Sequence, residues 1–247
     1  LFEPIDTSIV DTSQVLPEYV HEYGIGAIVW SYNIGYNTNV FPTGSHPQSW
    51  ADVFDLEKFP GKRTLPANSP APNLEVALMA DGVDPKDLYP LDVDRAFRKL
   101  DTIKHEVIWW ETNSQSQQLF ADEEVVTGLI LNGRAYDIVK EGAPIAIEWN
   151  QNIQSVDYLV VLKGSKNVDV AMHFINHMMG VEPQALVANL IAYAPTNPEA
   201  FDLIDPEVAP WLSTYPENLE KGFLINAEYW RDHLREVEER WTAWRLS

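Results

Sequence analysis

The sequence has 247 residues, with 17 basic and 37 acidic side chains, a formal net charge of −20, no cysteine and 45% hydrophobic residues. The length permits one large or two modest domains, and the apolar fraction is ample for a packed core, which excludes disorder and collagen-like repetition. The negative charge, without a basic cluster, makes nucleic acid a poor partner. The lack of cysteine excludes disulfides, thiolate metal sites and cysteine nucleophiles.

No apolar run in the sequence approaches the ~20 residues needed to cross a bilayer. Runs such as 159–162 and 128–131 fall far short of that length, so we expect a soluble chain. The first six residues contain neither a basic start nor a continuous apolar stretch, so no signal peptide is visible. We expect that any targeting segment has been removed or was never present.

The first part of the chain predicts a buried strand and a short helix. Residues 26–32 are largely apolar and favour a buried strand. Ser49 and Asp52 have the spacing of a capping box, which predicts a helix at 50–54.

Two further helices are predicted before residue 105. Asn73 can cap a helix at 74–80, which Gly82 ends. Between 92 and 104 the apolar residues recur at helical spacing with charges on the other side, which is typical of a half-buried surface helix.

From residue 107 the pattern alternates between strands and helices. We expect strands at 107–110, 125–131, 145–149 and 156–162, and helices at 114–120 and 134–141. Strands separated by helices favour an α/β layer with a mainly parallel sheet. The remainder is mostly helical, with helices expected at 168–179, 183–190 and 227–246.

The expected strands fall into two sheet regions, one at 26–32 and one between 107 and 162. These regions are consistent with two lobes, between which the chain crosses near Tyr32 and near Asp157. We expect lobe 1 to contain residues 1–32 and 158–225, lobe 2 to contain residues 33–157, and residues 226–247 to form a C-terminal helix that packs near the lobe junction.

Several stretches match one protein family, in the same order along the chain. They are Asp11-Thr12-Ser13-Gln14, Pro47-Gln48-Ser49-Trp50-Ala51-Asp52, Phe59-Pro60-Gly61-Lys62-Arg63, Asn132-Gly133-Arg134, Lys163-Gly164-Ser165-Lys166-Asn167 and Tyr193-Ala194-Pro195-Thr196-Asn197. Together they resemble the solute-binding proteins of bacterial ABC importers, in the branch related to spermidine and putrescine receptors. The resemblance covers essentially the whole chain and depends on the set, because no single motif carries it.

The resemblance implies an α/β, two-lobed, periplasmic-binding-protein-like fold of type II that clamps a small ligand in the cleft between its lobes. It implies delivery of that ligand to an ABC permease in the inner membrane, a periplasmic location, and no enzymatic activity, cofactor or metal. We expect a monomer. The first lobe is expected to be N-terminally truncated, because relatives begin with a signal peptide and opening elements that this chain lacks.

Arg134 is the candidate for binding an anion. It lies where a buried strand is followed by a helix, and the N-terminus of that helix adds partial positive charge. A guanidinium can hold a carboxylate through two parallel hydrogen bonds. The residues alone also allow an alternative, in which Arg134 pairs with Asp137 or Glu141 on its own helix.

Asp157 is the candidate for binding an amine. In polyamine receptors the matching aspartate contacts a ligand amine, although an aspartate at the start of a strand is ordinarily a turn former or a cap. Arg134 and Asp157 together offer one cation and one anion, which suits a zwitterion with separated charges.

The ligand expected from this pairing is an ω-amino acid of the γ-aminobutyrate (GABA) type, and the alternative is a polyamine such as putrescine or spermidine. The sequence departs from the aromatic box and extra carboxylates of polyamine receptors. Leu131 and Ser155 stand where aromatics would be expected, and the stretch 68–72 contains no acid.

Further ligand contacts are expected from aromatic and polar residues. Trp30, Tyr32 and Tyr193 could stack on ligand methylenes or face an ammonium group, although a tryptophan such as Trp30 is equally expected in a core. Ser114 and Gln115, at a helix start, could complete a carboxylate site, and helix capping alone would explain Ser114.

Three other functions are weaker alternatives. His173 and His177 have metal-binding spacing but no evident third ligand, so we expect a packed or solvated helix face. Paired carboxylates such as Glu111 and Glu148 could serve a hydrolase, but such pairs arise by chance in so acidic a chain. An acidic interaction protein without a small ligand is the third alternative.

Overall fold

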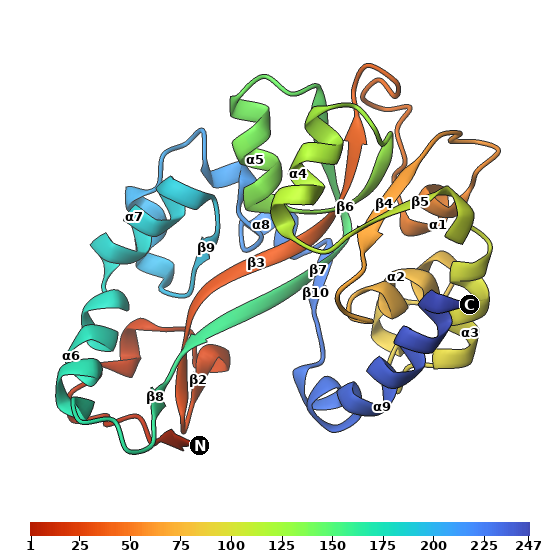
Figure 1. The fold of residues 1–247 in the computed structure, drawn as a ribbon. Helices are drawn as coiled ribbons and strands as arrows, with labels where there is room; N and C mark the ends of the chain where they lie inside the picture. Colours follow the sequence, from red (N-terminus) through yellow and green to blue (C-terminus); the bar gives the residue numbers. More distant parts are fainter. The chain divides into compact units, whose positions relative to one another are not determined.

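A computed structural model describes residues 1–247 and divides them into two compact units. Unit 1 contains Leu1–Ser31 and Gln154–Leu219, and unit 2 contains Tyr32–Ile153 and Glu220–Ser247. Both units combine helices with β-strands (Figure 1), which confirms the α/β class predicted from the sequence. Compared with the expected lobe limits, residues 154–157 belong to unit 1, whereas Tyr32, residues 220–225 and the C-terminal helix belong to unit 2.

Unit 1 is built around the first half of the long strand β3 (Gly24–Asn37). Strands β2 (Val20–His21) and β9 (Ala194–Pro195) both pair with β3 in antiparallel register, and β1 (Phe2–Glu3) pairs with β8 (Val161–Leu162). Its helices are α6 (Val168–Met178), α7 (Val181–Ile191) and α8 (Pro216–Leu219), and its 3₁₀ turns are Thr12–Gln14, Pro17–Tyr19, Pro198–Leu203 and Ala209–Trp211.

Unit 2 contains a sheet flanked by helices. The strand order is β10 (Gly222–Leu224), β7 (Ile145–Leu159), β3, β6 (Thr127–Leu131), β4 (Arg63–Pro66) and β5 (Val107–Trp110), with β3 and β7 continuing into unit 1. The helices are α1 (Trp50–Phe54), α2 (Asn73–Ala80), α3 (Val93–Asp101), α4 (Asn113–Ala121), α5 (Asn132–Lys140) and α9 (Ala227–Leu246), with 3₁₀ turns at Pro85–Asp87 and Lys104–Glu106.

The sheet of unit 2 is mixed, whereas the sequence pattern predicted a mainly parallel one. Strand β4 is parallel to both β5 and β6, as expected for strands joined by crossover helices. Strand β3, however, pairs with β6 in antiparallel register, with Tyr32 opposite Leu131 and Tyr36 opposite Thr127. Because β3 precedes the strand–helix alternation in the sequence, that pattern did not specify its direction.

The two strands expected at 145–149 and 156–162 are instead one long strand, β7, followed by the short β8. The polar residues between them suggested a break. Gln151 does adopt a positive φ of 60°, but its amide oxygen accepts a hydrogen bond from the backbone N–H of Trp50 at 3.0 Å. Its own backbone N–H donates to the carbonyl of Lys221 at 2.8 Å. Neighbouring segments therefore satisfy the polar groups that would otherwise favour a loop.

The predicted helix caps were partly correct. The Ser49 side chain accepts a hydrogen bond from the backbone N–H of Asp52, which confirms the cap of α1. Asn73 is the first residue of α2 and not its cap. Its side-chain amide is buried and donates to the carbonyls of Pro66 and Ser69, both at 2.8 Å. It therefore ties the helix to the preceding loop.

Helix α9 lies beside α2 and α3 in unit 2 (Figure 1). The indole N–H of Trp241 donates to the carbonyl of Ala67 at 2.9 Å, and Trp241 and Trp244 both stack on Phe97 of α3. These aromatic side chains of α9 hold the helix against α3 and the Ala67 segment of unit 2. None of the helices has the length and apolar character of a membrane span.

Candidate functional site

Arg134 lies in the first turn of α5, directly after the buried strand β6. The residue at the N-cap position is Leu131, which has no side chain able to cap the helix. The Nε atom of Arg134 is buried and has no hydrogen-bond partner. The first turn of α5 therefore combines an uncapped helix N-terminus with a guanidinium whose buried donor is unused.

The alternative in which Arg134 pairs along its own helix is not realised. Arg134 forms no ion pair with Asp137 or Glu141. Burial raises the pKa of the Asp137 carboxyl, and the positive charge of Arg134 opposes that rise. Gln117 of α4 instead donates to the backbone carbonyl of Arg134 at 3.3 Å, which fixes the turn and leaves the guanidinium uncommitted.

Tyr32 lies close in the fold to the start of α5. It pairs with Leu131 in the antiparallel register of β3 and β6, and Leu131 immediately precedes the helix. Its side chain is half-buried. The register thus brings Tyr32 near the residues that open α5, an arrangement that depends on a pairing across almost 100 residues of sequence.

Asp157 and Trp30 form the corresponding feature of unit 1. The indole N–H of Trp30, on β3, donates to Oδ1 of Asp157, on β7, at 3.0 Å. Trp30 is half-buried and Asp157 is exposed. Asp157 lies near the end of the continuous strand β7. It is therefore neither the turn former nor the cap that the residue type alone would suggest.

Tyr193 lies on the same stretch of sheet as Trp30. Strands β3 and β9 pair Ile28 with Pro195 and Val29 with Ala194, Trp30 directly follows Val29, and Tyr193 directly precedes β9. Unit 1 therefore contains the Trp30–Asp157 pair, and Tyr193 lies next to the short strand that pairs with β3.

Ser114 and Gln115 occupy the first turn of α4, but Gln115 is engaged in capping. Its side-chain oxygen accepts hydrogen bonds from the backbone N–H groups of Glu111 at 2.6 Å and Thr112 at 3.0 Å. The cap of α4 is Thr112 and not Ser114, which is exposed. The structure thus assigns Gln115 a structural role, and the side chain of Ser114 forms no hydrogen bond with Arg134.

The carboxylates proposed for a hydrolase have other partners or none. Glu148 faces Nε2 of His46 at 3.0 Å, and that imidazole stacks on Tyr36. Glu123, a further acidic residue that could enter such a pair, accepts hydrogen bonds from the side-chain amides of Asn37 and Asn39, which lower its pKa. Glu111 is exposed. No group of three metal-ligating side chains gathers anywhere in the chain, and His173 and His177 are both exposed on α6.

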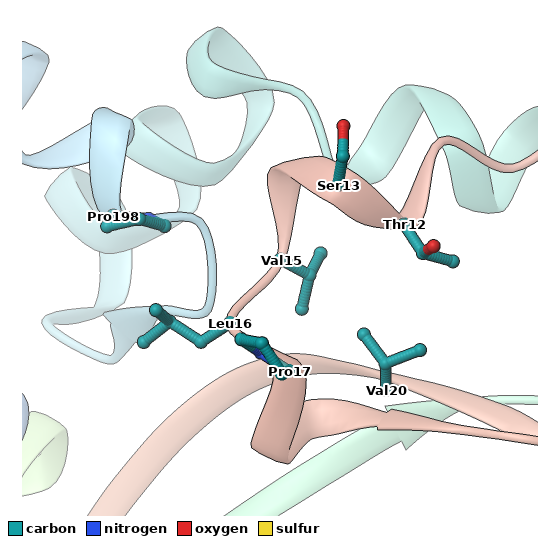
Figure 2. A pocket seen from close by; sticks show the side chains of 7 residues that line it. All are labelled: Thr12, Ser13, Val15, Leu16, Pro17, Val20 and Pro198. Carbon is teal, nitrogen blue, oxygen red and sulfur yellow. The ribbon is translucent and has the colours of Figure 1, made fainter.

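A separate pocket of about 450 Å³ lies in unit 1. Figure 2 shows Val15, Leu16 and Val20 around this space, while the hydroxyl of Ser13 points away from it. The remaining lining residues are Thr12, Pro17 and Pro198. The pocket contains no charged group and none of the residues predicted to bind ligand, so it does not suit a small charged solute.

The sequence pattern missed two properties of this region. The helix of Arg134 begins two residues earlier than predicted, at Asn132, and a leucine at its N-cap was the available signal for an unfilled helix N-terminus. The pairing of Trp30 with Asp157 joins residues 127 positions apart, and no local pattern could have shown it.

Comparison with known proteins identifies the family. Residues 1–219 match the model of the family described as bacterial extracellular solute-binding protein. The chain is 37% identical to the gamma-aminobutyric acid-binding protein of Pseudomonas aeruginosa PAO1, over 99% of this chain and 70% of that protein. A solved structure of a GABA receptor superposes with a TM-score of 0.92 at 43% identity, covering 99% of this chain and 75% of the other.

More distant relatives bind polyamines. The spermidine/putrescine-binding periplasmic protein of Escherichia coli K12 is 27% identical over 80% of this chain, which spans only 56% of that protein's length. The match in fold confirms the periplasmic-binding-protein-like architecture implied by the sequence motifs. The chain belongs to the bacterial extracellular solute-binding protein family, whose members supply substrates to ABC transporters.

Proposed function

We propose that this protein binds a small ω-amino acid of the GABA type, with Arg134 on the ligand's carboxylate and Asp157 on its ammonium group. The observation that carries the proposal is the unused, buried Nε donor of Arg134 at the uncapped start of α5. Such a donor is costly to bury without a partner, and a ligand carboxylate would satisfy both it and the helix N-terminus. The similarity to two GABA-binding proteins supports the same ligand class.

Asp157 supplies the complementary charge. It is exposed, it has no cationic partner in the protein, and it accepts a hydrogen bond from the indole of Trp30. An ammonium group at this carboxylate can also face an aromatic ring, a contact that contributes ~0.5 to 2 kcal/mol. We propose that Trp30, Tyr193 and Tyr32 contact the aliphatic part or the amine of the ligand, and that Ser114 has at most a peripheral role.

A polyamine is the competing ligand, because several relatives are named for spermidine, putrescine or cadaverine. Arg134 argues against it. A second ammonium group about 5 to 6 Å from the guanidinium would cost roughly 3 kcal/mol at an effective dielectric near 20, which is about a hundredfold in affinity. A zwitterion places its carboxylate at the guanidinium of Arg134 instead of a second ammonium group, so the interaction there is attractive.

The expected affinity follows from the two charged contacts. Each charge-assisted hydrogen bond contributes ~1.5 to 3 kcal/mol, and burial of three methylenes adds ~0.8 kcal/mol for each. Their sum is compatible with a dissociation constant near 1 μM, about −8 kcal/mol. We propose that the protein acts by binding alone, as a monomer in the periplasm, and hands its ligand to an ABC permease of the inner membrane.

Calorimetric titration with GABA, putrescine and proline tests the proposal. GABA should bind most tightly, and Arg134→Ala and Asp157→Ala should each weaken it by about tenfold or more. Lys140→Ala, on the exposed face of the same helix, and Asp202→Ala, an exposed acid of unit 1, are the matched controls and should leave the affinity unchanged. A protein that binds putrescine and not GABA would contradict the assignment.

A further inference from the structure

The carboxylate of Asp157 accepts a hydrogen bond from one side chain of the protein. Its Oδ1 atom receives the indole N–H of Trp30 at 3.0 Å, and no lysine, arginine or histidine forms an ion pair with it. Both residues belong to unit 1, so this contact is internal to that unit. An exposed aspartate with a single neutral donor has one oxygen fixed and one oxygen available.

We propose that Trp30 is a positioning residue, which orients Asp157 so that its Oδ2 atom meets the ammonium group of the ligand. This inference rests on the proposed function. An indole N–H can donate a hydrogen bond but cannot accept one. It therefore holds Oδ1 and does not compete with the carboxylate for the ligand's amine. The ligand then meets a carboxylate whose rotamer is already selected, so less side-chain freedom is lost on binding.

Because the indole donor of Trp30 is uncharged, the arrangement selects for a ligand with an ammonium group. An arginine or lysine at this position would also orient Asp157, but it would neutralise the carboxylate and repel an incoming ammonium group. Trp30 fixes the geometry and leaves the negative charge of Asp157 available to the ligand. A ligand that lacks an amine gains nothing from this arrangement.

The backbone on either side of Trp30 is firmly held. Val29 is fully buried, pairs with Ala194 of β9, and its carbonyl accepts a hydrogen bond from the hydroxyl of Ser213 at 3.1 Å. Ser31 on the other side is also fully buried. The indole is thus presented by a strand that is anchored in unit 1, which is what a positioning residue requires.

The first experiment replaces the donor and keeps an aromatic ring. Trp30→Phe removes the N–H, and we expect it to weaken GABA binding by about three- to tenfold in calorimetry. The matched control is Trp244→Phe, because the indole of Trp244 donates to Asp101 at 2.8 Å in a comparable pair on α9 and α3. The control should leave GABA affinity unchanged. Melting curves of both variants establish that each is folded at the titration temperature.

The second experiment is a double-mutant cycle that separates positioning from direct contact. If Trp30 acts through Asp157, Trp30→Phe should have less than a twofold effect in the Asp157→Asn background. Equal effects of Trp30→Phe in both backgrounds, or no effect in either, would overturn the inference. The proposed function fails by a different result: wild-type affinity for GABA that is unaltered by Asp157→Asn, whatever Trp30→Phe does.

Discussion

The indole N–H of Trp230, on the C-terminal helix α9, donates a hydrogen bond to the carboxylate of Glu75, on α2, at 2.6 Å. The same oxygen accepts the hydroxyl of Tyr89 at 2.7 Å, and the other oxygen is buried without a partner. Glu75 is fully buried. Burial raises its pKa from an ordinary value of 4.5 to about 7, against the opposing effect of the hydrogen bonds from Tyr89 and Trp230.

Glu75 should make the stability of unit 2 depend on pH. Because its pKa is higher in the folded state than in the unfolded state, its contribution to stability is fully present below pH 4.5 and is lost as the pH rises through 7. Each pKa unit corresponds to about 1.4 kcal/mol, so the loss is on the order of 3 kcal/mol. Denaturant unfolding at pH 5 and pH 8.5 measures it.

The variant Glu75→Gln isolates this effect from the other titrations of an acidic chain. Glutamine keeps the acceptor for Trp230 and Tyr89 but does not ionise, so the difference in unfolding free energy between wild type and variant should change by that amount across the same pH range. Glu228→Gln, an exposed residue of α9, should show no such change. A pH-independent difference for Glu75→Gln would contradict the prediction.

Arg63 should be essential to the loop between α1 and β4. Its guanidinium is fully buried and donates to the backbone carbonyls of Val53 and Asp55 at 3.0 and 3.1 Å, and also to those of Phe59 and Gly61. A lysine ammonium cannot reach four carbonyls arranged around a planar fork.

We therefore expect Arg63→Lys to lower the free energy of unfolding by about 3 kcal/mol. Lys62→Ala, which removes a neighbouring exposed lysine that pairs with Glu106, should cost no more than about 1 kcal/mol. Urea unfolding of the two variants makes the comparison. Similar losses for both would show that the buried hydrogen bonds of Arg63 contribute little.

Gly128 should not tolerate a side chain. It has a φ of +147° in β6, and a Cβ atom there would lie 2.2 Å from the carbonyl oxygen of Thr64 on the paired strand β4. Gly128→Ala should therefore destabilise the protein by at least 3 kcal/mol or prevent folding. Gly142 has a positive φ of 92°, but a Cβ atom added there would meet open space. Gly142→Ala should therefore lower the free energy of unfolding by only about 1 to 2 kcal/mol. Soluble yield and thermal melting distinguish the two.

Gln184 should hold together the segment that follows Tyr193. Its buried side chain accepts a hydrogen bond from the backbone N–H of Thr196 at 2.7 Å and donates to the carbonyl of Ala27 at 2.9 Å. Gln184→Leu leaves both groups unsatisfied and should cost about 2 to 4 kcal/mol. Gln48→Leu, at an exposed position, should change stability by less than about 0.5 kcal/mol. Thermal unfolding of the two variants provides the measurement, and equal melting temperatures would refute the role of Gln184.

Local signals in the sequence predicted the elements whose ends are defined by their own residues. The cap of α1 at Ser49 and the position of Arg134 near the start of a helix after β6 were both predictable, because a capping side chain and a switch from apolar run to helical period are local features. The short strand β4 was missed, since its four residues gain their strand conformation from pairing with β5 and β6.

Long-range contacts account for the rest. Three features depend on long-range pairings that a single sequence does not show. They are the hydrogen bond from Trp30 to Asp157, the cross-strand pairing of Tyr32 with Leu131, and the burial of Glu75 by a helix whose Trp230 lies 155 positions later. A lone charged residue between the apolar residues Leu74 and Val76 of α2 was the signal available for Glu75. It indicates a carboxyl that must find hydrogen-bond donors elsewhere in the fold.

The interleaved connectivity of the two units has a consequence for biosynthesis. Unit 1 cannot be completed until residue 219 has emerged from the ribosome, and unit 2 lacks β10 and α9 until residues 222–246 have been made. Until that helix is made, Glu75 is without the indole of Trp230, and the Ala67 carbonyl is without that of Trp241. Nascent chains of this protein should therefore remain sensitive to proteases until α9 has emerged.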